Sequence, residues 1–489
     1  EYGLQTTFDN YDANNNPHTI TEAANIPADT RQKTYTYTDI RHPNKVTTVT
    51  QDSVLPDNDK VTTFTYDNAG NITSEKIERV HVDTSRVELR NTSYTFGGPF
   101  HQLSEIDGPR PITDVDDRTI INYYLDDVSE GNNRAKMKSV TAPLNLLVAN
   151  NIQWTATGKI QGYDSLNNLQ VAFTYYPGND RLETITQTSL SQTTRLTYLA
   201  TGETESITTA YGSVDATTIT LEYDAARRLT RIYDGLGNYI HYTLDTEGNI
   251  KEENIYDSTN NLKKALTQTF DAYNRLDVVS QANETSDPTF APDGTLDISV
   301  DGNGATTDYS YDALRRLTQI KQDLNGTDPT TAIATTDVTY DSQDNLTTVT
   351  DPVNGTTTYV YDDLGNLLSQ NSPDSGVTSY TYDEAGNVKT MLTANGHTFT
   401  YTYDALNRLT LIDGSDTQDD RAYIYDNCTN GAGKLCRIVN EFISIEYTYD
   451  VLGNITNHQT ISYTHDKAKR LKTITYPSGA EIKYIYNAA

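Results

Sequence analysis

The sequence is poor in several residue types that most proteins use freely. It holds two Met, one Trp and two Cys in 489 residues, and Lys plus Arg number 37 against 67 for Asp plus Glu. The resulting net charge of −30 repels the phosphates of nucleic acids and anionic membrane surfaces. No apolar run approaches the length that spans a bilayer. We therefore expect no nucleic-acid partner and no membrane insertion.

The two cysteines, Cys428 and Cys436, stand eight positions apart with an Asn-Gly turn signal between them. This spacing suits a disulfide across one hairpin, with two buried thiols as the alternative. A disulfide would indicate an extracellular or exported protein. The first residues, EYGLQTTFDN, lack the regions of a signal peptide, so we expect any export signal to be removed or to lie elsewhere.

Tyrosine, in contrast, is abundant: 36 Tyr stand against nine Phe. Many of these tyrosines open a repeated motif, such as YDDLGNL at Tyr361, YDEAGNV at Tyr382 and YDALNRL at Tyr403, in steps of 21 residues. Degenerate copies of the motif, such as those at Trp154 and Leu244, continue the repeat at about the same spacing in other parts of the chain. The structural repeat residues that we assign are Tyr66, Asp67, Tyr223, Asp224, Tyr311, Asp312, Tyr361, Asp362, Tyr382, Asp383, Tyr403, Asp404, Tyr449 and Asp450.

Each unit reads as strand, turn and strand. The residues before Tyr-Asp alternate, the aspartate is placed to accept hydrogen bonds from backbone N–H groups of the turn, and Gly or Asn supplies the positive φ. We expect neighbouring tyrosines to stack across strands, with arginines after the turn over the rings. These arginines are Arg228, Arg275, Arg316 and Arg408. The pattern predicts an all-β fold of tandem antiparallel β-hairpins, with a structural role for the repeat.

The YDxxGNL and YDxxNRL units at this pitch resemble the YD repeat of the Rhs family, which includes bacterial toxin shells, the cocoon proteins of insecticidal toxin complexes and the teneurin YD shell. The resemblance implies a spiralling sheet that forms an open barrel or partial shell, often around a toxin passenger. It covers a partial array without the C-terminal core and toxin, so no autoprotease residue is transferred. We expect N-terminal YD-type hairpins over 1–78, an irregular insert-rich segment over 79–150 and the hairpin array over 151–489.

The repeat is hardest to see over residues 79–150, and function in repeat proteins tends to lie where the repeat is interrupted. Low-ranking catalytic candidates in this segment are His81, His101, Arg110, Arg118, Tyr123, Tyr124 and Arg134. A Tyr or His base beside a cation would suit β-elimination from a uronic acid. We expect a structural module for encapsulation, adhesion or assembly, and a polysaccharide lyase or glycan-binding protein is the alternative. The simpler interpretation of residues 79–150 is a set of surface loops without a catalytic role.

Cofactors are not expected, because the histidines form no ligand pair and two cysteines cannot complete a zinc site. Calcium at the acidic stretch from Asp297 through Asp301 to Asp308 is a weaker expectation, since the spacing fails the EF-hand pattern. The partners that we expect are a toxin or other passenger polypeptide, a cell-surface glycan, or further copies joined through the sheet edges.

Overall fold

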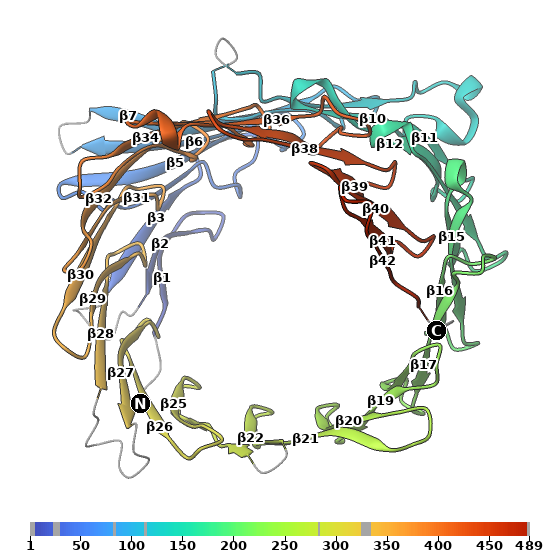
Figure 1. The fold of residues 1–489 in the computed structure, drawn as a ribbon. Helices are drawn as coiled ribbons and strands as arrows, with labels where there is room; N and C mark the ends of the chain where they lie inside the picture. Colours follow the sequence, from blue (N-terminus) through green and yellow to red (C-terminus); the bar gives the residue numbers. More distant parts are fainter. Residues whose placement is uncertain are drawn as a thin grey trace. The chain divides into compact units, whose positions relative to one another are not determined.

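A computed structural model describes residues 5–22, 30–81, 85–111, 115–281, 284–323 and 334–486. Within these ranges the chain is nearly all β: it forms two antiparallel sheets of 23 and 19 strands, and most strands pair with their neighbours along the sequence (Figure 1). The sheets are open ladders, not closed on themselves. The predicted all-β fold of tandem antiparallel hairpins is confirmed.

The contacts divide the chain into two units. Unit 1 comprises Glu1–Phe96, Glu105–Arg118 and Glu284–Asp419, and unit 2 comprises Gly97–Ser104, Thr119–Asn283 and Asp420–Ala489. Each unit thus combines stretches far apart in the sequence. The predicted boundaries after residues 78 and 150 describe consecutive segments and stay a prediction.

Unit 1 contains an N-terminal ladder and a second ladder built on the 21-residue repeat. Its elements are β1 (Thr7–Tyr11), β2 (Pro17–Glu22), β3 (Arg31–Thr36), β4 (Thr48–Asp52), β5 (Asn58–Tyr66), β6 (Ile72–His81), β7 (Arg86–Phe96), most of β8 (Leu103–Asp107), β23 (Glu284–Ser286), β24 (Thr289–Phe290), β25 (Leu296–Val300), β26 (Thr306–Tyr311), β27 (Leu317–Asp323), β28 (Ala334–Tyr340), β29 (Leu346–Thr350), β30 (Thr356–Tyr361), β31 (Leu367–Ser372), β32 (Gly376–Tyr382), β33 (Val388–Leu392), β34 (Thr398–Tyr403), β35 (Leu409–Gly414) and the 3-10 helix η6 (Thr417–Asp419).

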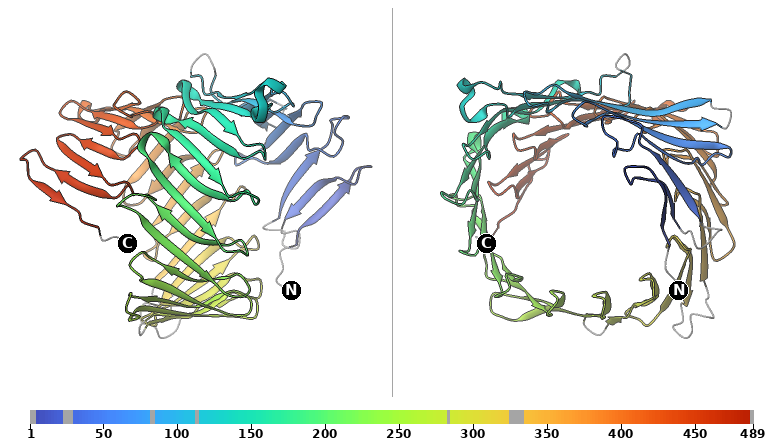
Figure 2. Two further views of the ribbon diagram at one scale, coloured as in Figure 1. Left: turned by 90° about the vertical axis from the view of Figure 1, so that its right-hand side faces the viewer. Right: turned by 180° about the vertical axis from the view of Figure 1, so that it is seen from behind.

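Unit 2 contains the remaining hairpins; Figure 2 shows its cyan and green strands side by side as a ladder. Its elements are β9 (Thr119–Tyr123), η1 (Val128–Asn133), β10 (Met137–Ala142), η2 (Pro143–Asn145), β11 (Leu146–Trp154), β12 (Ile160–Ser165), η3 (Leu166–Asn168), β13 (Gln170–Tyr175), β14 (Leu182–Gln187), η4 (Thr188–Leu190), β15 (Gln192–Tyr198), β16 (Thr204–Thr209), β17 (Thr217–Tyr223), β18 (Leu229–Tyr233), β19 (Tyr239–Leu244), β20 (Ile250–Tyr256), β21 (Leu262–Phe270), β22 (Leu276–Gln281), β36 (Arg421–Tyr425), β37 (Leu435–Val439), β38 (Ser444–Tyr449), β39 (Ile455–His458), β40 (Ile461–His465), β41 (Leu471–Thr475) and β42 (Glu481–Lys483).

The hairpins share one register. Tyr361 pairs with Leu367, Tyr382 with Val388 and Tyr403 with Leu409, each directly after a one-residue register shift. Such a bulge adds twist to the strand and starts the turn at the same place in every repeat. The sequence period is therefore a period of hydrogen-bond register.

The apolar core is sparse. Among the described residues the buried apolar side chains are Val61, Tyr124, Ala135, Ile152, Val171, Ala210, Ala405, Cys436 and Tyr449. Burial of apolar area is normally the main stabilising term of a fold. Few apolar side chains are fully buried here, so the hydrogen bonds of the ladders, turns and buried polar groups contribute a larger share of the stability.

Candidate functional site

The repeats named below share one geometry, a turn whose backbone N–H groups donate to the carboxylate of the repeat aspartate. In the turn after β30, Asp362 Oδ1 accepts from the backbone N–H groups of Leu364 and Asn366, both at 2.9 Å, and its Oδ2 accepts from Asn366 Nδ2 at 2.9 Å. Gly365 has a φ of 81°, in the left-handed region that glycine adopts without steric cost. The same acceptor role is filled by Asp67, Asp224, Asp312, Asp383, Asp404 and Asp450. These carboxylates are committed to the turns.

The tyrosine hydroxyls hold one hairpin to another. Tyr66 donates to the carbonyl of Val46 at 2.6 Å, and Tyr382 donates to that of Leu367 at 2.8 Å. Burial raises the pKa of the repeat tyrosines Tyr66, Tyr223, Tyr311, Tyr361, Tyr382, Tyr403 and Tyr449. The phenols therefore stay protonated and able to donate. Phenylalanine cannot donate this hydrogen bond, which favours Tyr at Tyr66, Tyr223, Tyr382 and Tyr449, whose hydroxyls all donate to backbone carbonyls.

The arginines after the turn bind their own aspartate first. Arg316 Nε donates to Asp312 Oδ2 at 2.7 Å, and its Nη1 reaches on to the carbonyl of Asp341 in the next turn at 2.9 Å. Its guanidinium also lies 5.0 Å from the ring centre of Tyr340, the cation–π contact that we expected. The other predicted arginines, Arg228, Arg275 and Arg408, likewise donate to the aspartate of their own turn.

In unit 1 one repeat turn is joined to the N-terminal ladder through a buried carboxylate. Asp363 has no exposed surface. Its Oδ2 accepts from Arg79 Nε at 2.7 Å and from Ser53 Oγ at 2.9 Å, and its Oδ1 accepts from the backbone N–H of Val54 at 2.9 Å and from Gln343 Nε2 at 3.0 Å. We call this set the Asp363 junction.

The Asp363 junction keeps its carboxyl group ionised. Burial acts to raise the pKa of Asp363, but the hydrogen bonds from Arg79, Val54 and Ser53 together outweigh burial and lower the pKa below its ordinary value. A buried carboxylate that is fully hydrogen-bonded and paired with a guanidinium is strongly coupled to its surroundings. Removing one partner therefore affects both ladders.

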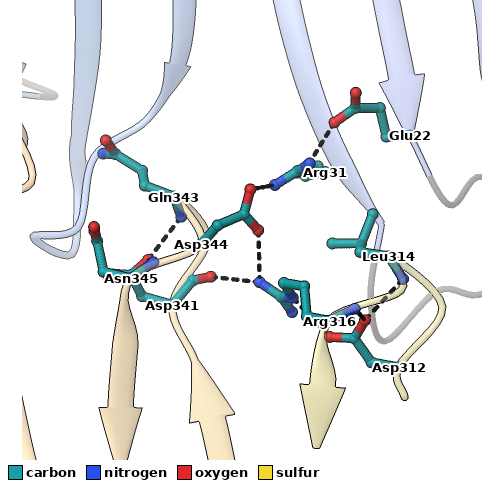
Figure 3. Close-up of polar contacts among 9 residues, drawn as sticks. All are labelled: Glu22, Arg31, Asp312, Leu314, Arg316, Asp341, Gln343, Asp344 and Asn345. Carbon is teal, nitrogen blue, oxygen red and sulfur yellow. Dashed lines mark hydrogen bonds and ion pairs between the residues drawn. The ribbon is translucent and has the colours of Figure 1, made fainter. Parts of the chain in front are cut away.

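A chain of ion pairs also joins the N-terminal ladder of unit 1 to its repeat ladder (Figure 3). Glu22 of β2 binds Arg31 of β3, and Arg31 Nη1 lies 2.6 Å from Asp344 Oδ2. Asp344 Oδ1 in turn lies 3.0 Å from Arg316 Nη1, and Arg316 binds Asp312. Asp344 is thus shared by an arginine from each ladder.

Arg110 makes a third connection within unit 1. Its side chain is 5% exposed, its Nη2 lies 2.8 Å from Asp383 Oδ2, and its Nη1 donates to the carbonyl of Asp404 at 2.8 Å. In the repeat before Asp404 the residue after the turn is Asn387, whose Nδ2 donates to Asn407 Oδ1 in the next turn at 3.0 Å, while the carbonyl of Asp404 accepts from Arg110. Arg110 thus donates to the carbonyl of Asp404 in the same way that Arg316 donates to the carbonyl of Asp341.

Unit 2 contains the predicted disulfide. Cys428 and Cys436 are bonded, with their Cα atoms 5.5 Å apart. The loop that they close meets η3, where Asn167 donates through Nδ2 to the carbonyl of Asn430 at 3.1 Å and accepts at Oδ1 from the N–H of Ala432 at 3.2 Å. The bridge therefore shapes a loop that docks on a distant hairpin.

A family model of the RHS Repeat matches residues 340–377, 361–398 and 382–418. These three overlapping matches each begin at the tyrosine of a turn that an aspartate closes. Residues 340–418 are RHS repeats. No curated protein matches it in sequence.

The chain also resembles solved structures. A crystal structure of TcdB2-TccC3 is 15% identical, with a TM-score of 0.53, over 97% of this chain and 27% of that chain. TcdB2-TccC3-TEV is 15% identical (TM-score 0.48, 99% and 28%), as is a Tc holotoxin pore of Photorhabdus luminescens (TM-score 0.45, 95% and 26%). The first of these supports a shared fold. This chain spans about a quarter of the length of each of the three.

The catalytic candidates in unit 1 have different surroundings. Arg110 is the buried connector described above, while Arg118 binds the carboxylate of Asp116 at 2.8 Å. His81 ends β6, where its backbone N–H donates to the carbonyl of Ser85 at 2.9 Å. The two arginines are engaged by carboxylates of the protein itself.

The candidates in unit 2 are also divided among separate contacts. Tyr123 donates to the carbonyl of Leu103 at 2.7 Å, like a repeat tyrosine, and Tyr124 accepts from Gln153 Nε2 at 2.7 Å. The other two candidates in unit 2 are His101 and Arg134. His101 lies in an exposed turn with a φ of 58°, and Arg134 binds Asp126. A catalytic role for any of these seven residues stays a prediction.

The calcium stretch also has a turn geometry. Asp301 Oδ1 accepts from the N–H groups of Asn303 and Ala305, both at 2.9 Å. Across the described ranges, no three His, Cys, Asp or Glu side chains gather in a way that could hold a metal ion. No helix in the described part of the chain is both long and apolar enough to cross a membrane.

Sequence reasoning did not identify the residues of the Asp363 junction. One weak signal was present: Asp363 directly follows the repeat aspartate Asp362, at a position that Ala313 and Ala405 occupy in other repeats. The position varies among the repeats, with Ser342 and Glu384 in the two neighbouring units, so the carboxylate of Asp363 is not required by the turn itself. Its partners from the N-terminal ladder, Ser53, Val54 and Arg79, lie in a part of the chain with no periodic relation to it.

Proposed function

We propose that this chain is a wall segment of an exported, hollow YD-repeat shell that encloses a polypeptide passenger. The observation that carries the proposal is the match of 97% of the chain to the TcdB2-TccC3 fold. The RHS repeats support it, because an aspartate closes each of their turns and the Tyr382 hydroxyl joins one hairpin to the hairpin before it. The enclosing role is what the resemblance of the repeats to the Rhs family implies, and we extend it to this chain.

Two physical features agree with a wall. The Asp363 junction and the Arg31–Asp344 pair join ladders that are roughly 300 residues apart in sequence, so unit 1 resists separation of its ladders. The disulfide between Cys428 and Cys436 is stable only in an oxidising environment, which supports export.

The alternative function, a polysaccharide lyase or glycan-binding protein, has no specific observation in its favour. Four of its candidate side chains, Arg110, Arg118, Tyr123 and Arg134, are already engaged by carboxylates or a backbone carbonyl. Incubating the chain with a panel of uronic-acid polysaccharides and measuring unsaturated product by ultraviolet absorbance would test this alternative directly.

Protease protection tests the proposed function. The complete gene product would be treated with a broad-specificity protease, and surviving peptides would be identified by mass spectrometry. We expect a non-repeat segment to survive together with the RHS repeats and to become cleavable once urea opens the wall. The same segment produced alone is the control. If every non-repeat segment is cleaved as fast as that control, the enclosing role is wrong.

A further inference from the structure

A row of polar side chains crosses three strands of unit 1 and faces a repeat turn. Lys33 of β3 lies opposite Gln51 of β4, and Gln51 lies opposite Lys60 of β5. Residues directly opposed in an antiparallel sheet project from the same face. All three line a cavity of about 150 Å³ that is bounded on the repeat side by Ser342, Gln343 and Asp344, and Arg31 also lines it. The cavity adjoins the Asp363 junction through Gln343, which donates to Asp363 Oδ1 at 3.0 Å.

The donors around this cavity are largely unused. Across the described residues, neither Lys33 nor Lys60 has a carboxylate oxygen within 4.0 Å of its ammonium group. Lys60 Nζ donates to Gln343 Oε1 at 3.1 Å. The Gln51 amide and the Ser342 hydroxyl donate to no acceptor within the described ranges. Two cations and two neutral donors thus converge on one small space.

The carboxylates near the cavity are already committed to other groups. Asp344 is shared by Arg31 and Arg316, and Asp363 binds Arg79. Asp52 also lines the cavity, where its backbone carbonyl accepts from Gln343, while the residue itself is exposed. None of these carboxylates forms an ion pair with Lys33 or Lys60.

Burial of the Lys60 ammonium group is incompletely compensated. Both lysines are half-buried. Burial lowers the pKa of Lys60 and the charge of Lys33 adds to this effect, while Asp363 and Asp362 oppose it. Desolvated like charges that face one another are unfavourable unless an opposite charge lies between them. An anion in the cavity would supply that charge.

We propose that this cavity binds a small oxyanion, with inorganic phosphate as its representative. The Lys33 and Lys60 ammonium groups supply the charge, and the Gln51 amide and Ser342 hydroxyl donate to the remaining oxygens. The cavity of about 150 Å³ has room for one such ion with little water. A carboxylate of a bound polypeptide offers the same chemistry from another source. This inference is independent of the shell proposal.

Isothermal titration of the purified full chain with inorganic phosphate, at low ionic strength, tests the site. We expect saturable binding of one phosphate, weakened at least about tenfold in Lys33→Gln and in Lys60→Gln, since each removes one charged donor. Lys389→Gln, at an exposed lysine of β33 in the same unit, is the matched control and leaves the affinity unchanged. Titration with N-acetylaspartate separates the sources, because a site for polypeptide carboxylates binds it at least as tightly as phosphate.

A Gln51→Glu variant gives a second test that does not remove either lysine. It places a carboxylate between Lys33 and Lys60, so we expect a higher melting temperature without phosphate and loss of phosphate binding. The site is supported if either oxyanion binds saturably to the native chain and this binding is lost in Lys60→Gln and in Gln51→Glu. No saturable binding of either oxyanion, or phosphate binding that persists unchanged in Lys33→Gln, Lys60→Gln and Gln51→Glu, overturns it.

Discussion

Arg79 of β6 donates through Nε to Oδ2 of Asp363 at 2.7 Å, across 284 positions of the sequence. Asp363 has no exposed surface and Arg79 is 21% exposed, so the pair is largely shielded from water. The same carboxylate accepts the N–H of Val54. One aspartate in a repeat turn therefore fixes two strand regions of the N-terminal ladder.

Replacing Asp363 with Asn should destabilise unit 1. The amide removes the negative charge, leaves Arg79 largely buried without its ion pair, and turns an N–H group toward a donor. We expect a loss of about 2–4 kcal/mol in the free energy of unfolding. Hydrogen exchange at the amide of Val54, which donates to this carboxylate, reports the local effect. Asp374→Asn, at an exposed aspartate of the same unit, is the control and should change stability by less than about 0.5 kcal/mol.

The stability that Asp363 provides should depend on pH. Its pKa is lowered in the folded chain, because the hydrogen bonds from Arg79, Val54 and Ser53 outweigh the opposing effect of burial. A lowered pKa adds stability above the ordinary pKa of about 4 and loses it as the pH falls through the folded value. Urea unfolding at a series of pH values should show the native chain and Asp363→Asn converging below about pH 4. A constant difference down to the lowest pH would contradict this assignment.

The repeat tyrosines should be sensitive to loss of the hydroxyl alone. Tyr382→Phe removes the hydrogen bond to the carbonyl of Leu367 and keeps the ring. We expect a cost of about 1 kcal/mol, because the buried carbonyl loses its donor. Tyr273, which is 80% exposed, gives the matched control Tyr273→Phe, with no measurable change in the thermal midpoint. Equal effects of the two variants would mean that the hydroxyl bonds are unimportant.

Loss of the disulfide should loosen unit 2 locally. Replacing Cys428 and Cys436 with Ser frees a short loop, and chain-entropy estimates for a loop of this size give about 2–3 kcal/mol. The amide of Ala432, which donates to Asn167, should exchange faster with solvent. The amide of Val54 in unit 1 serves as the internal reference. Unchanged exchange at Ala432 would show that the loop docks without the bridge.

The hairpins were predictable because each is specified within one 21-residue unit. The turn at Asp362, for example, is closed by atoms no more than four positions away, so the local pattern contains the full signal. The disulfide was predictable for the same reason. The role of Arg316 was only partly foreseen: the ring contact was expected, but the bond to its own aspartate was assigned to backbone donors alone.

The junctions were beyond the sequence pattern. Asp363 meets Ser53 and Arg79, whose positions are related to it by the packing of two ladders and by no repeat spacing. The row from Lys33 to Lys60 depends on the register of β3, β4 and β5, where the motif is degenerate. Residues that act across ladders carry no periodic signal, and only the tertiary structure brings them together.

The central claim is that this chain forms the curved wall of a hollow body. Electron cryomicroscopy of the purified chain, supported by small-angle X-ray scattering in solution, measures this most directly. We expect a thin curved sheet around a solvent-filled space, with a pair-distance distribution weighted toward long distances. A solid globule without an internal space, or a flat unbent ribbon, would contradict it.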